Sequence, residues 1–413
     1  MLNLNSRQNL AKDLNQPLTI GNKQIANRLF LAPMAGLGHI ALRRTIAQFG
    51  GYGLLFTGMF SARAVPTENP LKSAVFSWRQ EELPNLVGQI FGSEPKVMAA
   101  AAKRLEQEGF WGVDINMGCS VSAIVKRGCG AALLRQPQQA LDIIKAVKDV
   151  VDFPVLVKMR SGWDSEYLAS RNFENNPPPD ALFTNNLSSK QSNSENAGQG
   201  NAQNNIQSEG QEGVRPAKTY NPPTTDLAPT IELALALQEA GVAAITFHPR
   251  TSPDRRTRPP NLNHLKIITE ALSIPVFGNG NICTASDAQK MLTQTLCAGL
   301  SIGRMAIARP WLLHCLSTGI DEMENAEVFL KQSAFSTLDA MFEYFEPNMA
   351  DKLYRKYLLY LCGNFASGSR IYGQLTKGLF KNRTYPELVE DIAAQLALGP
   401  QITRQPNMLL FNM

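Results

Sequence analysis

Short apolar runs alternate with amphipathic segments along most of the chain, which predicts repeated β-strand and α-helix units. The amphipathic segments, such as residues 94–109 and 136–151, carry apolar side chains at helical spacing. Eight such units, ending near residue 320, predict an α/β fold of the TIM (β/α)8 barrel type, because an open doubly wound sheet needs no closing eighth strand. The predicted strands begin at Arg28, Tyr52, Asn85, Gly112, Pro154, Ala244, Pro275 and Leu300.

One segment interrupts this alternation. Residues 164–225 are rich in Asn, Gln, Ser, Gly and Pro and poor in large apolar side chains, so burial cannot offset the entropy lost on ordering them. We expect a disordered insertion after the fifth strand, either a tolerated loop expansion or a mobile lid over the catalytic face. Since 413 residues exceed one domain, we expect a disordered N-terminus over 1–17, the barrel over 18–320 and a smaller domain over 321–413.

The use of cysteine and histidine argues against a disulfide framework or a metal site. The six cysteines are dispersed without a C-x-x-C pair, and there are only four histidines. No apolar run approaches the roughly 18 residues of a membrane span, and the first residues lack the apolar core of a signal peptide. We therefore expect a cytoplasmic protein with reduced thiols, no membrane segment and no metal. The net charge of +5 permits a polyanionic partner without requiring one.

Polar residues stand at or just beyond the ends of the fourth to eighth predicted strands. In a barrel these ends converge on one mouth, where active sites are built. A single lysine or histidine at such a position is more often a satisfied structural residue, but five consecutive strands share the pattern. The glycine clusters at 277–282 and 301–305 expose backbone N–H groups where such barrels hold phosphate, so we expect a phosphorylated cofactor or substrate. The residues are Asn116, Cys119, Lys158, Arg160, His248, Arg250, Asn279 and Arg304.

The order and spacing of seven motifs resemble those of the tRNA-dihydrouridine synthases, which are FMN-dependent TIM-barrel reductases with a C-terminal all-α helical domain. The motifs are "RLFLAPMAG", "LVGQIFGS", "DINMGCS…GCGAALL", "VLVKMRSGW", "ITFHPRT", "IPVFGNGNI" and "LSIGRMAIARPW". The resemblance implies FMN in the barrel mouth, NADPH as reductant and tRNA as partner. It places Pro33, Met34 and Ala35 under the isoalloxazine ring, Gln89 and Lys158 at its polar edge, His248 beside it, and Asn279, Gly280, Gly303 and Arg304 around the phosphate.

The same resemblance assigns roles on the substrate side. Asn116 and Cys119 would face the uracil base, and Arg160 and Arg250 would contribute to substrate binding. Reduction of the C5=C6 bond needs a hydride at C6, which a flavin can supply, and a proton at C5, which the thiol of Cys119 can give as a general acid. Lys158 would stabilise negative charge on the reduced flavin. Cys129 is expected to be a small buried apolar residue.

Several residues at the mouth depart from the family pattern. Ser120 and Pro249 stand where proline and glycine are usual, Gly38 and His39 replace a Thr-Asp pair, and Gly58 replaces a glutamate. These changes leave the expected FMN residues largely intact. They alter the surroundings of the substrate, so we expect a changed position specificity or a reduced activity.

The region from 352 to 383 contains seven Lys or Arg residues and no acidic residue, with tyrosines between them. Alone, this pattern suits a helical cap with a tyrosine and leucine core and solvated charges. Beside a pyrimidine-reducing barrel it also suits tRNA binding, with Arg355 and Lys356 on phosphates and the aromatic rings available for stacking. Two other functions remain open: a free-pyrimidine reductase similar to dihydroorotate or dihydropyrimidine dehydrogenases, and a divergent RNA-binding barrel with reduced activity.

Overall fold

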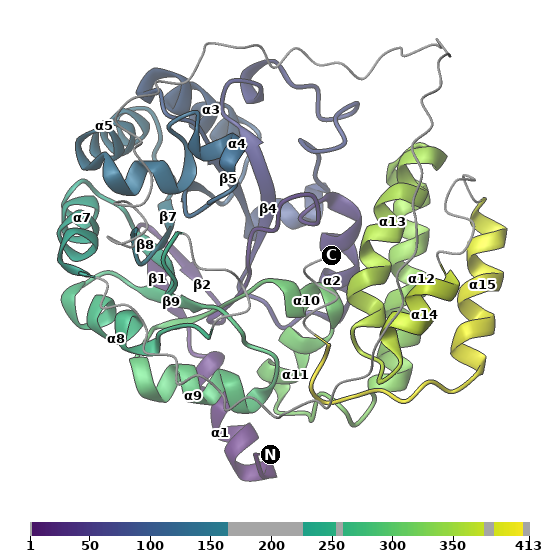
Figure 1. Cartoon of the computed structure of the whole chain (residues 1–413). Coiled ribbons are helices and arrows are strands. Elements are labelled where there is room, and N and C mark those ends of the chain that lie inside the picture. The colour runs from purple at the N-terminus through teal and green to yellow at the C-terminus, as the bar shows by residue number, and fades with distance from the viewer. Residues whose placement is uncertain (1, 164–225, 253–258, 376–383, 408–413) are drawn as a thin grey trace, which may run out of the picture. The chain divides into compact units, whose positions relative to one another are not determined.

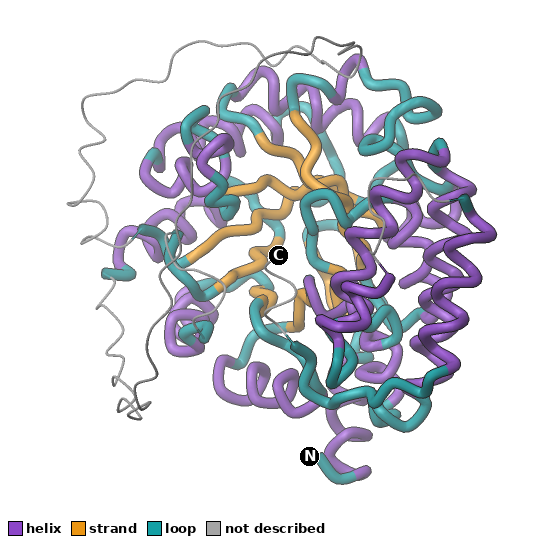
Figure 2. Tube along the Cα trace, turned by 45° about the vertical axis from the view of Figure 1, so that its right-hand side comes forward, coloured by secondary structure: helices purple, strands orange, loops and turns teal. Residues whose placement is uncertain are grey.

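The eight predicted strands close into a parallel barrel. The computed structural model describes residues 2–163, 226–252, 259–375 and 384–407, and its strands pair in the order β10-β3-β4-β5-β6-β7-β8-β9. Figure 1 shows this barrel with the C-terminal helices beside it, and Figure 2 shows the strands within a ring of helices. The prediction of a TIM barrel is confirmed, whereas the predicted insertion at 164–225 lies outside the described residues. The strands are β3 Leu29–Leu31, β4 Leu54–Ser61, β5 Leu86–Phe91, β6 Gly112–Met117, β7 Val155–Arg160, β8 Ala244–His248, β9 Val276–Asn279 and β10 Gly299–Ile302.

The long helices around the barrel bury an apolar face, whereas the short α4 has no buried residue. Met98, Ala102 and Leu105 of α3 share such a face and are fully buried. Helices α3 and α5 both begin at a proline, which has no N–H to leave unbonded in the first turn. No helix among the described residues is both long and apolar enough to cross a bilayer. The barrel helices are α2 Ile40–Phe49, α3 Pro95–Gln107, α4 Ser122–Val125, α5 Pro137–Lys148, α7 Ala228–Glu239, α8 Leu262–Ala271, α9 Ala285–Thr295, α10 Arg304–Ala308 and α11 Leu312–Thr318.

A short hairpin of β1 (Leu18–Ile20) and β2 (Lys23–Ile25) closes the N-terminal end of the barrel. Ile20 and Ile25 join an apolar cluster with side chains from the beginnings of the strands, among them Phe30 and Phe277. The rings of Phe30 and Phe277 stack with centroids 3.8 Å apart. This apolar layer fills the barrel interior at the N-terminal ends of the strands, so the polar side chains of the interior lie toward the mouth.

In the described part of the C-terminal region, four helices follow the barrel: α12 (Ala326–Tyr344), α13 (Pro347–Cys362), α14 (Gly368–Leu375) and α15 (Tyr385–Ala397). Helix α12 packs along α2, and the buried hydroxyl of Thr337 donates to that of Thr45 at 3.1 Å. Helix α13 packs on both α12 and α10. Because α2 and α10 follow barrel strands directly, this packing sets the helical region against the barrel.

The N-terminal residues form a helix, so the prediction of a disordered segment over 1–17 was wrong. Helix α1 spans Leu4–Leu14 and is capped by the side chain of Asn3, which accepts from the Ser6 N–H at 2.8 Å. Leu10 and Leu14 are buried where α1 packs on α11. The segment is polar on average, but its few apolar side chains lie on one helical face, and their burial stabilises it.

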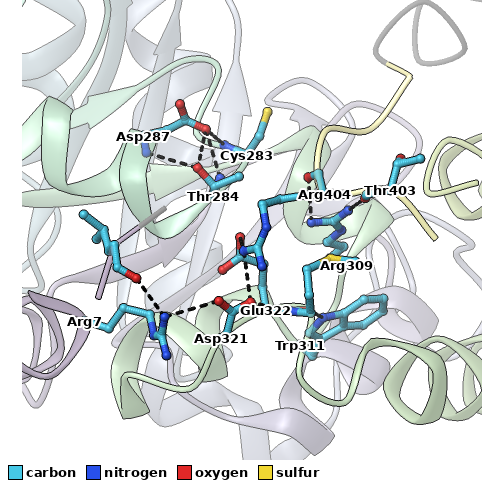
Figure 3. A network of polar contacts seen from close by, with 12 residues as sticks. Arg7, Cys283, Thr284, Asp287, Arg309, Trp311, Asp321, Glu322, Thr403 and Arg404 are labelled. Atoms are coloured by element: carbon cyan, nitrogen blue, oxygen red, sulfur yellow. Dashed lines mark hydrogen bonds and ion pairs between the residues drawn. The ribbon is translucent and has the colours of Figure 1, made fainter. Parts of the chain in front are cut away.

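Polar contacts join the two ends of the chain around the α11–α12 connection (Figure 3). Arg7 of α1 and Arg404 near the C-terminus both pair with Asp321, at 3.3 and 2.9 Å. Arg309, fully buried after α10, donates to the side chain of Asn364 at 2.8 Å and to the carbonyls of Thr403 and Arg404. These contacts attach the C-terminal segment to the barrel helix that follows β10.

Candidate active site

A pocket opens at the carboxyl ends of strands β3, β7, β8, β9 and β10. It brings together every residue that the sequence predicted for the cofactor except Ala35 and Gln89, which lie outside its lining. Ser301 and Asn281 also line it, although neither was predicted. The predicted residues in the lining are Pro33, Met34, Lys158, His248, Asn279, Gly280, Gly303 and Arg304.

The glycine turns after β9 and β10 keep one side of the pocket open. Gly280 has a φ of 127°, and a Cβ there would stand 3.1 Å from the His248 ring. A Cβ on Gly303 would stand 3.0 Å from the Met34 sulfur. Arg304 donates to the Asn281 side chain at 3.1 Å, which holds its guanidinium beside these turns. Exposed backbone next to a fixed cation suits an anionic group such as a phosphate.

Lys158 and Asp114 place opposite charges inside the barrel. Burial lowers the pKa of Lys158 to about 8, with Arg160 adding to the shift and Asp114 opposing it. Burial raises the pKa of Asp114 to about 7, against the hydrogen bond from Gln89 and the charge of Lys158. Sequence reasoning missed Asp114, although a carboxylate between Val113 and Ile115 of an apolar strand was a usable signal.

His248 is a neutral ring held by its neighbours. Burial and then the positive charges of Arg160 and Lys158 lower its pKa well below the ordinary value. Its Nε2 lies 2.9 Å from the guanidinium of Arg250, which is 2% exposed. Arg160 donates to the carbonyls of Gly118 and Thr251, at 2.7 and 3.2 Å. Arg160 thus links the loops after β6 and β8, and the substrate contacts of both arginines stay a prediction.

Gln89 of β5 and Asn116 of β6 lie side by side, and Cys119 follows on the loop after β6. Asn116 donates to Gln89 Oε1 at 2.8 Å and accepts the Cys119 N–H at 2.9 Å. Cys119 is partly exposed, whereas the other five cysteines are buried and all six are free. Burial raises the pKa of the Cys129 thiol, and this residue packs inside as expected.

Three of the departures from the family pattern pack against one another or against the helical region. The Gly58 N–H donates to the Gly38 carbonyl at 3.1 Å. His39 caps α2, accepting the Leu42 N–H on Nδ1, and its buried ring meets that of Phe345 edge to face at 5.3 Å. Burial, with Arg43 and Lys356 nearby, lowers the pKa of His39 to about 3, so the ring stays neutral.

The tyrosines of α13 are core residues, so the prediction that they are available for stacking was wrong for Tyr354, Tyr357 and Tyr360. Tyr354 donates to the Ala334 carbonyl at 2.9 Å. Tyr354 therefore faces α12, and its ring centroid lies 5.6 Å from that of Tyr357, three residues on.

The two predicted phosphate contacts on α13 differ in their surroundings. Arg355 pairs with fully buried Asp351 at 2.9 Å. Lys356 extends toward the mouth, with Nζ 3.5 Å from the carbonyl oxygens of both Ala35 and Gly36. Lys356 thus puts a cation from the helical region directly beside the β3–α2 loop.

Comparison with known proteins gives one family and several relatives. The family described as "Dihydrouridine synthase (Dus)" matches residues 30–175 and 225–394. A probable tRNA-dihydrouridine synthase from Rickettsia bellii (strain RML369-C) is 28% identical, over 73% of this chain and 75% of that protein. The tRNA-dihydrouridine synthase B of Vibrio parahaemolyticus is 28% identical, over 83% of this chain and 88% of that protein. Among solved structures, a 2-naphthoyl-CoA reductase complex has a TM-score of 0.48 at 12% identity, covering 96% of this chain and 71% of that one.

Proposed function

The chain belongs to the dihydrouridine synthase family, and from this membership we propose that it reduces the C5=C6 bond of uridines in tRNA to give 5,6-dihydrouridine. Two further findings support the proposal. Relatives that cover most of the chain are named tRNA-dihydrouridine synthases. The barrel mouth also carries a lysine, a neutral histidine and glycine turns in one pocket.

The cofactor we propose is FMN, with NADPH as the source of its electrons. The pocket fits such a group on two counts: Gly280 and Gly303 leave space that a side chain would fill, and Arg304 is held beside them. Asn279, Gly280, Gly303 and Arg304 would hold the phosphate, and Pro33, Met34 and Ala35 would lie against the ring system. When bound, the flavin supplies the hydride that C6 of the base accepts.

Lys158 brings a positive charge to the polar edge of the pocket, whereas His248 does not. Since the pKa of Lys158 is about 8, its ammonium is largely protonated at neutral pH and favours negative charge at the polar edge of the ring. His248 is neutral, so it can serve as a hydrogen-bonding partner without adding a second positive charge. Gln89 would complete this edge from β5.

Cys119 is the proton donor in this proposal. Its partly exposed thiol lies on the loop after β6, where Asn116 holds the backbone. A thiol at this position can give its proton to C5 of a base lying in the pocket. Arg160, Arg250 and Asn116 would then orient that base.

We place tRNA on the face shared by the mouth and α13. Lys352, Lys356 and Arg370 are exposed on the helical region, and Lys356 reaches the β3–α2 loop. Contacts of these cations with phosphates would position the tRNA while its target uridine leaves the base stack to enter the pocket. Such a reaction on tRNA belongs in the cytoplasm.

The observation that carries the proposal is the family match, together with the exposed thiol at the mouth. Cys119→Ala is expected to leave flavin binding and NADPH oxidation largely intact while dihydrouridine formation falls by about 10²-fold or more. Cys129→Ala, with its buried thiol, is the matched control and should keep its activity. Full dihydrouridine formation by the Cys119 variant would remove this residue from the reaction.

A further inference from the structure

A chain of three side chains joins a buried carboxylate to the loop that carries Cys119. Asp114 accepts from the Gln89 amide on Oδ2 at 2.6 Å, and Gln89 accepts from the Asn116 amide at 2.8 Å. Asn116 Oδ1 then accepts the N–H groups of Gly118 and Cys119, at 3.2 and 2.9 Å. The three side chains are 0–6% exposed, so water cannot easily replace these bonds.

The donor-to-acceptor direction of these hydrogen bonds follows from the groups at the two ends: Asp114 accepts at one end, and the loop N–H groups donate at the other. Because Asp114 Oδ2 accepts, Gln89 turns its NH2 group toward Asp114 and its oxygen toward Asn116. Asn116 must in turn give its NH2 group to Gln89, which leaves its oxygen to face the two loop N–H groups. If both amides were reversed, the NH2 group of Asn116 would face two other donors, and the loop would lose its acceptor.

We propose that Asp114 is a positioning residue, which fixes the orientation of Gln89 and Asn116 and thereby holds the Cys119 loop in place. The claim that the held thiol donates a proton rests on the proposed function. The claim that Asp114 holds the Cys119 loop in place does not. Asp114 is not among the residues that line the pocket, and it acts on the Cys119 loop through the two amides.

The strand register explains how one residue can act over this distance. Gln89 is paired with Asp114 between β5 and β6, so the carboxyl and the amide extend into the barrel side by side. Asn116 follows Asp114 by two residues and therefore faces the same side of β6. Asp114 Oδ1 has no hydrogen-bond partner among the described residues, so no second contact competes to set the orientation.

The test follows alkylation of Cys119 by iodoacetamide in the native, FMN-loaded protein, with the modified peptide identified by mass spectrometry. Cys119 is the suitable probe because the other cysteines are buried. Asp114→Ala and Gln89→Met, which removes the next side chain of the hydrogen-bond chain, are both expected to raise the labelling rate of Cys119 by about fivefold or more. In both variants Asn116 is no longer held in the orientation that offers its oxygen to the loop. The double variant Asp114→Ala/Gln89→Met should label no faster than the faster of the two single variants, because both substitutions break the same series of hydrogen bonds.

Asp114→Asn separates geometry from charge. Like Asp114→Ala, this variant removes the carboxylate charge, but it keeps a side-chain oxygen that can accept from the Gln89 amide. The labelling rate of Cys119 should therefore stay within about twofold of the wild-type rate. Thr295→Val, a buried substitution at the far end of α9, controls for general loss of stability and should leave the rate unchanged. If Asp114→Ala does not fold, Gln89→Met and Asp114→Asn still give the comparison.

Wild-type labelling in both Asp114→Ala and Gln89→Met would overturn the inference, as would equal labelling of Asp114→Asn and Asp114→Ala. Dihydrouridine formation on tRNA is measured in the same variants. If Asp114→Ala and Gln89→Met label faster but the wild-type protein does not modify tRNA, the positioning role is supported and the proposed function is contradicted. If both variants label at the wild-type rate and the wild-type protein does modify tRNA, the proposed function is supported and the positioning role is contradicted.

Discussion

The backbones of Gly38 and Gly58 lie in direct contact at the barrel mouth. The Gly58 N–H donates to the Gly38 carbonyl at 3.1 Å, and a Cβ on Gly38 would stand 2.5 Å from the Gly58 nitrogen. The contact falls where the pairing of β4 with β5 shifts register, between Phe56 and Met59. The glycine at 38 is therefore required by the approach of the β3–α2 loop to this irregular part of β4.

The contact predicts a large cost for alanine at Gly38 and a small one at Gly58. Gly38→Ala should lower the free energy of unfolding by about 1–3 kcal/mol, because its Cβ meets backbone that cannot move aside alone. Gly58→Ala should cost less than about 0.5 kcal/mol in packing, since its Cβ would come no closer than 3.4 Å to the Met34 carbonyl oxygen. Urea denaturation of both variants measures the difference. Equal costs would contradict this description of the loop.

Arg355 and Lys356 are expected to have different roles despite their adjacent positions. Arg355→Ala removes an ion-pair partner of fully buried Asp351 and should destabilise the protein by about 2–4 kcal/mol. Lys356→Ala should change stability by less than about 1 kcal/mol and reduce the salt dependence of tRNA binding by about one counterion. Denaturation curves and a salt series of tRNA affinities separate the two effects. An unchanged salt slope for Lys356→Ala would remove this residue from the tRNA contact.

The strands and the mouth could be predicted from sequence because each barrel strand is buried on both faces. Such strands appear as apolar runs, and polar residues such as Lys158 and His248 stand out at their ends. The spacing of Tyr354, Tyr357 and Leu361 also contained the information that these tyrosines are buried, because residues three and four apart share a helical face.

Two features depended on tertiary contacts that no local pattern reveals. Helix α1 lies in a polar segment, and it is stabilised by docking Leu10 and Leu14 on α11. The role of Asp114 depends on its pairing with Gln89, which lies 25 residues away and becomes its neighbour only through the strand register. A carboxylate in an apolar strand signals a special environment but does not identify its partner.

The buried ring of His39 predicts a specific contribution to acid unfolding. Its pKa is about 3 in the folded protein and about 6.5 in an unfolded chain, so between these values only the unfolded state binds the proton. Stability is therefore lost as the pH falls, at up to about 1.4 kcal/mol per pH unit for this one group. His39→Asn keeps a helix-capping side chain and removes the titration, so the variant should gain stability relative to the wild type on acidification.

Urea denaturation near neutral pH and at about pH 4.5 measures this difference between variant and wild type. The same substitution at half-buried His314 controls for the loss of an imidazole. A constant difference across the two pH values would show that the His39 ring is not held neutral.

Arg309 is expected to stabilise the attachment of the C-terminal segment. Arg309→Lys keeps the charge but cannot donate to Asn364 and both carbonyls of Thr403 and Arg404, so it should cost about 2–3 kcal/mol. The exposed pair of Arg63 and Glu94 provides the control, and Arg63→Ala should cost less than about 0.5 kcal/mol. Similar costs for the two variants in urea denaturation would mean that the buried contacts add no stability.

The most direct test of the proposed reaction is a single turnover with tRNA that carries no dihydrouridine. FMN-loaded protein is reduced with NADPH under anaerobic conditions and mixed with this tRNA, while flavin absorbance and dihydrouridine content are followed together. We predict that the oxidised flavin spectrum returns as dihydrouridine appears in equal amount, and that Cys119→Ala slows both by about 10²-fold. A flavin that stays reduced with tRNA, or one that is reoxidised as fast by free uracil or orotate, would contradict a tRNA uridine reductase.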